Sequence, residues 1–476
     1  MVFSGITFLF YFLPILLFVY FFTPNKLKNV VLLAASLLFY TWGEGYFVLL
    51  MVLSICMNYV FGYLIAQKLS KAILLLAVGL NLSLLVLFKY AEFILHNISA
   101  ALIFVGLSPL SVPSIHLPLG ISFFTFQAIS YLIDIYRKEI PYQKNVLNLG
   151  LYISLFPQLI AGPIVRYKDV MQDIKVRTFS STLFASGVER FVIGLGKKML
   201  IANPLGLVVD NIFSVPFESL PTHIAWLGVL LYALQIYFDF SGYSDMAIGL
   251  GRIFGFRFLE NFRYPYAATS IQDFWRRWHI SLSTWFRDYL YIPLGGNRVG
   301  NVRVYFNLVL VFFVCGLWHG ASWNFIVWGL FHGFFLSIER MGVSNILASS
   351  HRAIQHVYVW IVVLVSWVFF RAETLPDALN YLHVMFAFNF GDVPFEITDS
   401  LNMRVILALL IGLLISVPTL SSIRNNSIFT QLQLGDAAKR ANLVFTIKVL
   451  GLFTILFLSC VNMASSTHNP FIYFRF

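Results

Sequence analysis

The sequence predicts an all-α protein that crosses a membrane many times. Of its 476 residues, 59% are hydrophobic and only 11% are charged, whereas about a quarter of the residues in a soluble domain are charged. The mean hydropathy is +0.81. Because a helix needs about 20 apolar residues to cross a bilayer, the chain has room for roughly 11 transmembrane helices joined by short loops.

Apolar runs place the expected spans in the first third of the chain, near 3–22, 29–43, 46–66, 72–95, 119–135 and 148–160. The first run, "FLFYFLPILLFVYFF", has no basic segment before it and no small-residue cleavage site. We therefore expect a first span there and not a cleaved signal peptide. A last span is expected at about 442–463.

The charges predict an orientation. The net charge of +11 could indicate nucleic-acid binding in a soluble chain, but cytoplasmic loops of membrane proteins carry excess Lys and Arg, so we expect no nucleic-acid partner. The basic loops 24–28, 67–71 and 137–139 should then be cytoplasmic. The acidic stretch 390–399 should lie outside, and the C-terminal tail 465–476 is expected to be extracytoplasmic.

The middle of the chain, 165–303, is rich in basic residues, and its apolar runs are short and broken. Such segments at membrane depth predict re-entrant or interfacial helices that line a cavity. No internal repeat divides the sequence, so we expect a single domain, 1–476. Cys56, Cys315 and Cys460 lie far apart in apolar runs. They predict neither a disulfide framework nor a metal site, and we expect no tightly bound cofactor.

The stretch "FWRRWHISLSTWFRDYLYIPLGG" (274–296) predicts an amphipathic helix over 274–290. At helical spacing, its aromatic residues share one face, and Arg276, Arg277 and Arg287 share the other. We expect this helix at the cytoplasmic interface, with arginines that attract an anionic substrate. His279 lies at the edge of the apolar stripe, either as a functional group or as a hydrogen-bonded boundary residue.

A second histidine lies in "CGLWHGASWNFIVWGLFHG" (315–333). A buried imidazole costs free energy unless it has a partner, and ionisable groups within membrane segments are candidates for function. This makes His319 the leading candidate, with Trp318 and Asn324 as candidates to line its site. In one unbroken helix, His332 would lie roughly 20 Å from His319 on another face, so we expect no shared metal and a packing role for His332.

Further polar residues lie in "LQIYFDFSGYSDMAIGLGRIFG" (234–255). Asp239 follows Gln235 by one helical turn, so both face the same way. Carboxylates at membrane depth usually pair with a cation or line a cavity. Gln235, Asp239, Tyr243 and Asp245 could therefore line the substrate site or could pair with the arginines of 252–287.

Motifs of other enzyme classes are absent from the sequence: it contains no Gly-x-Ser-x-Gly elbow, Walker loop or HExxH. A base would have to be a histidine in an apolar passage. Such an environment favours the neutral imidazole, the form that removes a proton from a hydroxyl.

Together these segments resemble the membrane-bound O-acyltransferase family. The resemblance includes "LPLGISFFTFQAISYLIDIYR" (117–137), "FPQLIAGPIVRY" (156–167) and both histidine segments. It implies a ring of helices around a thinned centre with a tunnel between the two membrane faces. Its near-invariant histidine falls on His319, and its second signature position falls on His279.

The resemblance also implies a mechanism. A cytosolic acyl-CoA, acetyl-CoA in our expectation, would be the donor substrate. His319 would act as general base on the acceptor hydroxyl while His279 orients or polarises the donor. The acceptor would be an extracytoplasmic polysaccharide such as alginate or peptidoglycan, reached directly or through a periplasmic SGNH-type acetyltransferase. The protein would reside in a bacterial inner membrane.

Two alternatives concern the tail and the protein class. Tyr473 in "FIYFRF" could carry the acyl group as a covalent relay, or it could anchor the tail in the interfacial aromatic belt. The alternative class is a transporter or flippase whose histidines relay protons. A secondary transporter commonly has repeated halves, which the sequence does not show.

Overall fold

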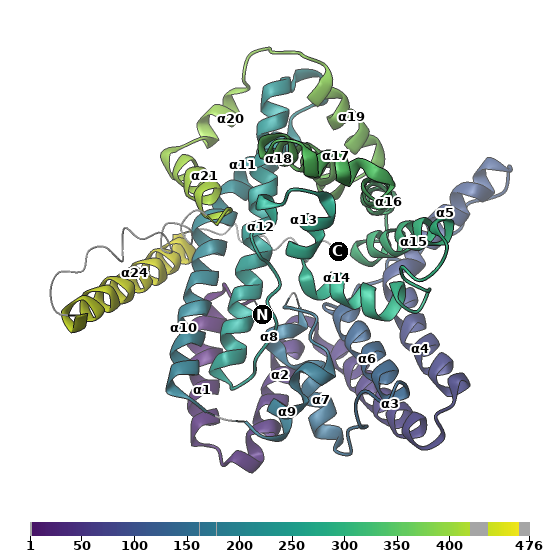
Figure 1. The fold of residues 1–476 in the computed structure, drawn as a ribbon, viewed down its shortest axis with the longest axis vertical. Helices are drawn as coiled ribbons and strands as arrows, with labels where there is room; N and C mark the ends of the chain where they lie inside the picture. The colour runs from purple at the N-terminus through teal and green to yellow at the C-terminus, as the bar shows by residue number, and fades with distance from the viewer. Residues whose placement is uncertain (1, 161, 178, 419–436, 466–476) are drawn as a thin grey trace.

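The computed structural model describes residues 2–160, 162–177, 179–418 and 437–465 (Figure 1). Every regular element in these ranges is a helix. The all-α prediction is therefore confirmed.

The N-terminal half consists of short and long helices joined by turns and by loops, such as 105–120 between α5 and α6. In chain order the helices are α1 (Leu13–Phe22), α2 (Lys28–Glu44), α3 (Val48–Lys68), α4 (Lys71–Leu85), α5 (Ala91–Phe104), α6 (Ile121–Tyr136), α7 (Val146–Ser154), α8 (Phe156–Leu159), α9 (Tyr167–Lys175), α10 (Ser181–Gly196) and α11 (Asn203–Ser214). Single 3₁₀ turns lie at Asn25–Leu27 and Gly45–Phe47, and π-helical turns lie at Thr7–Phe12, Val86–Tyr90 and Lys197–Ala202.

The C-terminal half begins with the longest helix. Its helices are α12 (Thr222–Ile253), α13 (Ile271–Arg277), α14 (Ile280–Phe286), α15 (Asn301–His319), α16 (Trp323–Ile338), α17 (Ser344–Ser349), α18 (Arg352–Arg371), α19 (Leu375–Phe386), α20 (Phe395–Ser400), α21 (Met403–Ile415) and α24 (Ala437–Ser465). The 3₁₀ turns lie at Phe217–Ser219 and Pro265–Ala267, and the π-helical turns at Arg287–Tyr291 and Glu339–Val343.

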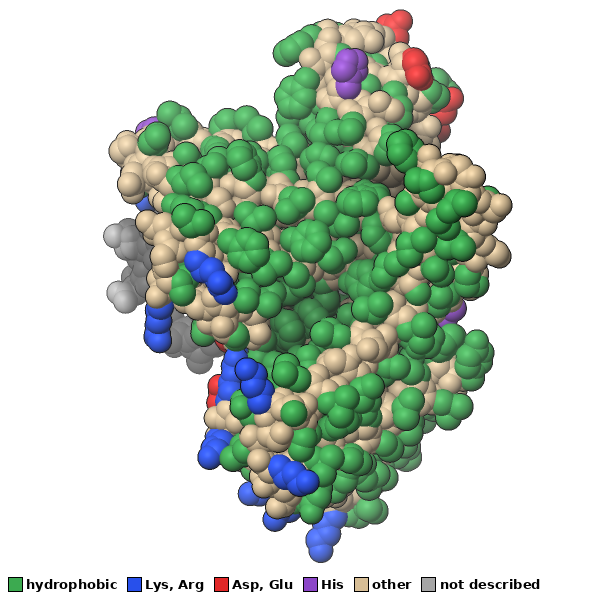
Figure 2. Space-filling view, turned by 90° about the vertical axis from the view of Figure 1, so that its right-hand side faces the viewer, with side chains coloured by type: hydrophobic (Ala, Val, Ile, Leu, Met, Phe, Trp, Pro, Cys, Tyr) green, Lys and Arg blue, Asp and Glu red, His purple; other side chains and the backbone are tan. Residues whose placement is uncertain are grey.

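The chain is a multi-pass membrane protein by the length and composition of its helices. Seven helical segments of the described residues are long and apolar enough to cross a bilayer, and three shorter apolar helices accompany them. One segment, Asn25–Lys68, contains both α2 and α3. Figure 2 shows a broad hydrophobic face with Lys and Arg gathered along one edge. Such one-sided charge is typical of a positive-inside orientation.

The central stretch differs from the prediction in part. Two of the seven candidate spans, Ser181–Ser214 and Thr222–Ile253, lie within it, so re-entrant or interfacial helices do not account for the whole stretch. The helices α10 and α12 pack closely because glycines face each other; a Cβ on Gly194 would lie 2.5 Å from the carbonyl oxygen of Gly242. Ion pairs between these buried helices interrupt the apolar pattern, which explains the error.

The predicted helix 274–290 is also not a single helix. The backbone of Trp278 is extended, and His279 adopts φ +43°, so α13 and α14 are separate short helices. The aromatic face is buried in protein: Trp278 is 2% exposed and Trp285 is 6% exposed. Figure 1 shows α13 and α14 near the middle of the molecule, surrounded by longer helices. The aromatic stripe therefore packs against neighbouring helices and not into a lipid interface.

The two histidines of 315–333 do not share a helix either. The helix α15 ends at His319, Gly320 is extended, and α16 begins at Trp323. The two helices approach closely at Gly316 and Gly329: a Cβ on Gly316 would collide with the carbonyl oxygen of Phe325, and one on Gly329 with that of Phe312. Small residues allow this kind of close helix packing in membranes.

The close packing of α15 against α16 predicts that a methyl group added at Gly316 destabilises the protein. Gly316→Ala should lower the thermal unfolding temperature of the purified protein, because overpacking of a close contact costs about 1–3 kcal/mol. Gly79→Ala is the matched control, since a Cβ there has no heavy atom within 4 Å. Equal stability of the two variants in a fluorescence-monitored melt would contradict the close α15–α16 packing.

Candidate active site

His319 is the last residue of α15, and its side chain is held among aromatic rings. The residue is 3% exposed. Its ring centroid lies 4.9 Å from that of Trp328, 4.9 Å from that of Trp318 and 5.2 Å from that of Phe370. The helix end thus places an imidazole in an apolar environment, as the sequence predicted.

The carbonyl groups at this helix end have partners from a distant part of the chain. The last carbonyls of a helix lack intrahelical partners. Lys89 Nζ donates to the Trp318 carbonyl at 2.5 Å, to the His319 carbonyl at 3.3 Å and to Ser122 Oγ at 3.2 Å. The hydroxyl of the next residue, Tyr90, donates to the Leu317 carbonyl at 2.7 Å. Two adjacent residues therefore cap α15.

Lys89 and Tyr90 were not among the predicted site residues. They lie in a π-helical turn, Val86–Tyr90, between α4 and α5. Turns of this kind occur frequently at functional sites. The signal in the sequence was a lysine inside the apolar run "LSLLVLFKYAEFIL", since an ionisable residue at such a position is a functional candidate.

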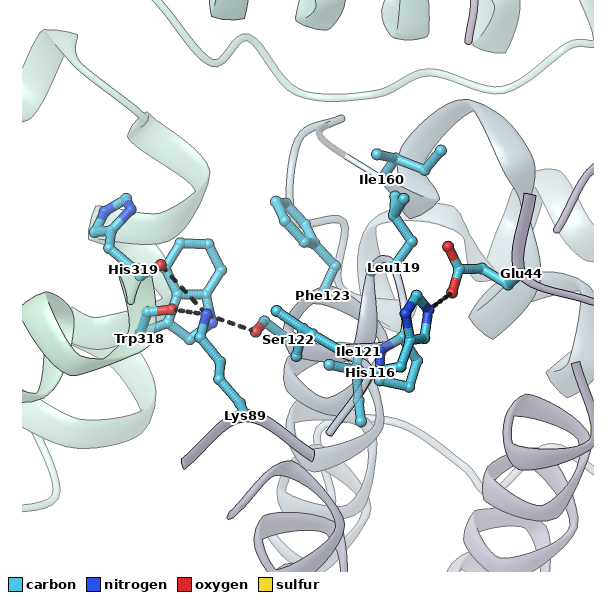
Figure 3. A pocket seen from close by; sticks show the side chains of 13 residues that line it. Glu44, Lys89, His116, Leu119, Ile121, Ser122, Phe123, Ile160, Trp318 and His319 are labelled. Atoms are coloured by element: carbon cyan, nitrogen blue, oxygen red, sulfur yellow. Dashed lines mark hydrogen bonds and ion pairs between the residues drawn. The ribbon is translucent and has the colours of Figure 1, made fainter. Parts of the chain in front are cut away.

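A cavity of about 160 Å³ lies next to His319 (Figure 3). We call it the His319 cavity. Lys89, Ser122, Trp318 and His319 lie on one side of it, and Glu44 and His116 lie on the other. His116 Nε2 is 3.0 Å from Glu44 Oε2. Its lining residues come from the end of α2, the turn after α4, residues 116–123 at the start of α6, Ile160 after α8 and the end of α15.

His279 is the second buried histidine. It is fully buried between α13 and α14, and its Nδ1 lies 3.2 Å from Asn261 Oδ1. Asn261 Nδ2 donates to Ser244 Oγ, and Ser281 donates to Asn261 Oδ1 from both its N–H and its hydroxyl. Because Oδ1 only accepts, His279 must donate from Nδ1.

This hydrogen bond assigns the tautomer of His279. With the proton on Nδ1, Nε2 carries a lone pair, and it has no hydrogen-bond partner among the described residues. His279 lies outside the candidate spans, and burial lowers its pKa to about 3. The ring is therefore neutral at ordinary pH, and its Nε2 can only accept a hydrogen bond.

Trp318 connects the two histidines. Its indole centroid lies 4.9 Å from the His319 ring and 6.0 Å from the His279 ring. Lys89 Nζ lies 5.8 Å from the centroid of the same indole. The structure thus brings His319, His279 and Trp318 together, although 40 residues separate the histidines in the sequence.

A second cavity, of about 440 Å³, lies along the preceding turns of α15 and shares no lining residue with the His319 cavity. We call it the Arg276 cavity. Arg276 and Arg287 line it together with Ile280, Phe312 and Cys315. Cys315 lies four residues before His319, which is one helical turn or about 6 Å along the axis. The two cavities therefore approach α15 within a single turn.

The two arginines of this cavity, Arg276 and Arg287, differ in whether a carboxylate neutralises their charge. Arg287 is paired with Asp288 at 2.7 Å, and Arg166 contacts the same carboxylate at 2.8 Å. Burial alone would raise the pKa of Asp288, but its hydrogen bond to Arg287 and the nearby cations lower it below its usual range. Arg276 has no ion pair with a described carboxylate, so its charge is available to an anionic ligand.

Four predicted residues lie on α12 and line neither cavity. Asp239 pairs with Lys198 at 2.6 Å, and Asp245 pairs with Arg190 and Lys197 at 2.7 Å. Of the two alternatives, the structure shows pairing for the carboxylates, but the cations come from 190–198 and not from the arginines of 252–287. Gln235 packs against Gly206, and Tyr243 stacks on Phe3. These contacts hold α12 in the core.

Three other residues have structural contacts. Arg277 pairs with Asp273 at 2.9 Å. Asn324 Nδ2 donates to the carbonyls of Ala372 and Glu373, which fixes the end of α18. His332 is fully buried and accepts a hydrogen bond from Trp275 Nε1 at 3.3 Å. Tyr473 lies outside the described residues. In the described part of the chain, no group of His, Cys, Asp and Glu is placed to hold a metal ion.

Comparison with known proteins identifies the family. The model of the membrane-bound O-acyltransferase family matches residues 45–375. The chain belongs to the membrane-bound O-acyltransferase family. The matched range contains both histidines, the Lys89 cap and, except for Glu44, the residues that line both cavities. The protein is therefore an O-acyltransferase, and the transporter alternative loses its support.

Three relatives show the range of named activities. The chain is 40% identical to the "Probable alginate O-acetylase AlgI" of Pseudomonas putida over 100% of both chains. It is 39% identical to the "Peptidoglycan O-acetyltransferase" of Helicobacter pylori, over 80% of this chain and 79% of that one. It is 32% identical to the "Teichoic acid D-alanyltransferase" of Bacillus subtilis, over 45% and 56%. All three names describe the transfer of a small acyl group.

Because Lys89 caps α15, its replacement should reduce acyl transfer. Lys89→Met removes the donor to two carbonyls at the end of α15, and each buried carbonyl left without a partner costs about 1–3 kcal/mol. We expect acyl transfer by the purified protein to fall at least tenfold. Lys71→Met, an exposed cation at the start of α4, is the control. Unchanged activity in Lys89→Met would contradict the capping role.

The neutral His279 predicts a pH profile. Its pKa of about 3 means that it does not titrate between pH 5 and pH 9 in the native protein. Asn261→Asp places a carboxylate on Nδ1, which favours the imidazolium and raises the pKa. As the pH falls, the variant should protonate His279 and lose activity at a pH where the native protein keeps it. If the acyl-transfer rates of the two proteins had the same dependence on pH, the assigned tautomer would be contradicted.

Proposed function

We propose that the protein transfers an acetyl group from cytosolic acetyl-CoA to a hydroxyl group, for the O-acetylation of an extracytoplasmic polysaccharide. The observation that carries the proposal is the convergence of two cavities on one turn of α15. One cavity contains an unpaired arginine, and the other contains His319. We infer that two substrates reach neighbouring turns of α15, one through each cavity.

The Arg276 cavity fits the donor. It combines the exposed Arg276 with apolar side chains from α14 and α15, which suits the phosphates and the thioester end of an acyl-CoA respectively. Next to Arg287, the carbonyl of Asp288 accepts a hydrogen bond from Arg137. Arg137 lies in the loop that the charge pattern predicts to be cytoplasmic. A cytosolic donor could therefore enter on this side, as the sequence analysis expected.

His319 is proposed as the general base. Its imidazole removes the proton from the acceptor hydroxyl, and the resulting oxygen attacks the thioester carbonyl. The carbon–sulfur bond then breaks, and the thiolate of CoA takes the proton from His319. The lone pair on His279 Nε2 accepts a hydrogen bond from an N–H or O–H group of the bound donor. This supports an orienting role and does not support polarisation of the carbonyl, which would need a donated proton.

The acceptor and the later steps follow from the relatives. Alginate and peptidoglycan appear in the names of two relatives that match most or all of the chain, so an acidic or amino-sugar glycan of the cell envelope is the proposed acceptor class. We propose residence in the bacterial inner membrane, with the glycan reached directly or through a periplasmic SGNH-type partner. In the second route, Tyr473 is proposed to relay the acyl group.

Radiolabelled acetyl-CoA tests this function. Purified protein in lipid nanodiscs should release CoA and transfer label to a hydroxyl acceptor or to its own tail. His319→Ala should reduce this transfer by a factor of 10² or more, within the range of general-base contributions. His332→Ala is the matched control, since that histidine lines neither cavity. Tyr473→Phe in the same assay separates the relay from direct transfer.

Full activity in His319→Ala would contradict the proposed base. Label transfer from a donor other than acyl-CoA, with none from acetyl-CoA, would contradict the proposed donor while leaving the family assignment intact.

A further inference from the structure

A third cavity has no histidine among its lining residues, and all of its charged lining residues are cations. Its volume is about 460 Å³, and it lies where α1, the start of α2, the end of α9 and the end of α12 meet. Four cations line it: Lys26, Lys28, Lys175 and Arg177. No carboxylate is among its lining residues. We call it the basic cavity.

None of these four cations forms an ion pair with a carboxylate in the described part of the chain. Elsewhere in the molecule, cations such as Lys198 and Arg190 are paired within 2.7 Å of a carboxylate. Four like charges around one cavity repel each other unless an anion neutralises them. The basic cavity therefore has the electrostatics of an anion site.

Two of the cations are held in place by contacts that leave their charge intact. Arg177 Nη1 donates to Tyr20 Oη at 3.1 Å, and its guanidinium lies 4.7 Å from the ring centroid of Phe256. Lys28 Nζ lies 5.0 Å from the ring centroid of Tyr20. The Tyr20 hydroxyl in turn donates to the Phe254 carbonyl at 2.9 Å. The site is thus organised before any ligand binds.

The backbone at the end of α12 leaves space for Arg177. Gly255 adopts φ +86°, and a Cβ at that position would lie 3.3 Å from the Arg177 side chain. The bare backbone lets the aliphatic part of Arg177 lie directly against the helix end. A larger residue would have both a strained backbone and a crowded arginine.

Exposed apolar side chains lie beside the cations. Phe22 is 77% exposed, Val176 is 66% exposed and Phe179 is 60% exposed. Val176 and Phe179 line the cavity itself, and the ring of Phe21 contacts that of Phe179 at 5.3 Å. A small soluble anion would gain nothing from this rim. A ligand with an anionic head and apolar chains would use both features.

The location in the chain fits a membrane ligand. The apolar helix α1 ends at Phe22, and a candidate span begins at Asn25, so the turn between them lies at a membrane interface. The loop 24–28 is one of the basic loops that predict the cytoplasmic side. Lys and Arg at that surface attract the anionic lipids of the facing leaflet.

We propose that the basic cavity binds the phosphodiester headgroup of an anionic phospholipid, such as phosphatidylglycerol, from the cytoplasmic leaflet. The phosphate contacts Lys28 and Arg177 inside the cavity and Lys26 and Lys175 at its rim. The acyl chains lie along Phe22 and Phe179. This site is separate from acyl transfer and does not depend on the proposed function.

Binding should also stabilise the core. Tyr20 and Arg177 connect the cavity to Phe254 and Gly255, which follow the last residue of α12. The same helix contributes Asp239 and Asp245 to the buried ion pairs with α10 and the turn after it. A lipid that neutralises the four cations therefore holds α1, α9 and α12 together.

Lipid binding to the purified, delipidated full-length chain in neutral detergent tests the proposal. Phosphatidylglycerol should remain bound in native mass spectrometry and should raise the unfolding temperature. Phosphatidylcholine and inorganic phosphate should do neither. The double variant Lys26→Gln/Lys175→Gln changes two exposed cations, so it should fold. Each charge near an anionic headgroup contributes roughly fivefold to affinity, so we expect about 25-fold weaker binding.

The matched control is Lys68→Gln/Lys71→Gln, which removes two exposed cations from another loop on the predicted cytoplasmic side. It should bind phosphatidylglycerol as the native protein does. Equal weakening in both double variants would overturn the proposal, because it would indicate unspecific attraction to the surface. Full stabilisation by inorganic phosphate would overturn the lipid assignment, as would equal binding of phosphatidylcholine.

Discussion

The structure of the site depends on the hydrogen bonds that the last carbonyl groups of α15 accept in apolar surroundings. The helix α15 ends in the interior, and unpaired carbonyls there would cost several kcal/mol. Lys89 and Tyr90 supply the missing donors to three successive carbonyls. Because of this cap, α15 can stop at His319, and the imidazole can lie beside a cavity without a continuing helix to cover it.

The same principle explains the rest of the site. His279 is held in a left-handed backbone conformation between two short helices, and Asn261 fixes its proton on Nδ1. Asp239 and Asp245 are neutralised by nearby cations from the α10 side. The α12 carboxylates are thus paired and structural, whereas His319 lines a cavity and can meet a substrate there. Arg276 is exposed and lines the second cavity, and His279 Nε2 has no hydrogen-bond partner among the described residues.

Much of this was predictable from the sequence, and the errors have physical causes. Composition and apolar runs predicted the all-α, multi-pass fold, and burial of a polar side chain identified His319. The helical spacing of the aromatic residues over 274–290 could not reveal the break at His279. A single residue with a left-handed backbone interrupts the helix without changing the order of apolar and polar residues on either side of it. The α10 and α12 spans were missed because ion pairs between helices place charges inside apolar runs. Lys89 and Asn261 were missed because their partners lie 229 and 18 residues away.

The central claim is that a donor from one cavity and an acceptor from another meet at the end of α15. A structure of the protein with a non-hydrolysable acetyl-CoA analogue tests it most directly. The phosphates of CoA should lie at Arg276 and the acyl carbon beside the ring of His319. An analogue bound elsewhere, with His319 still enclosed by Trp318, Trp328 and Phe370 and no opening toward the ligand, would contradict it.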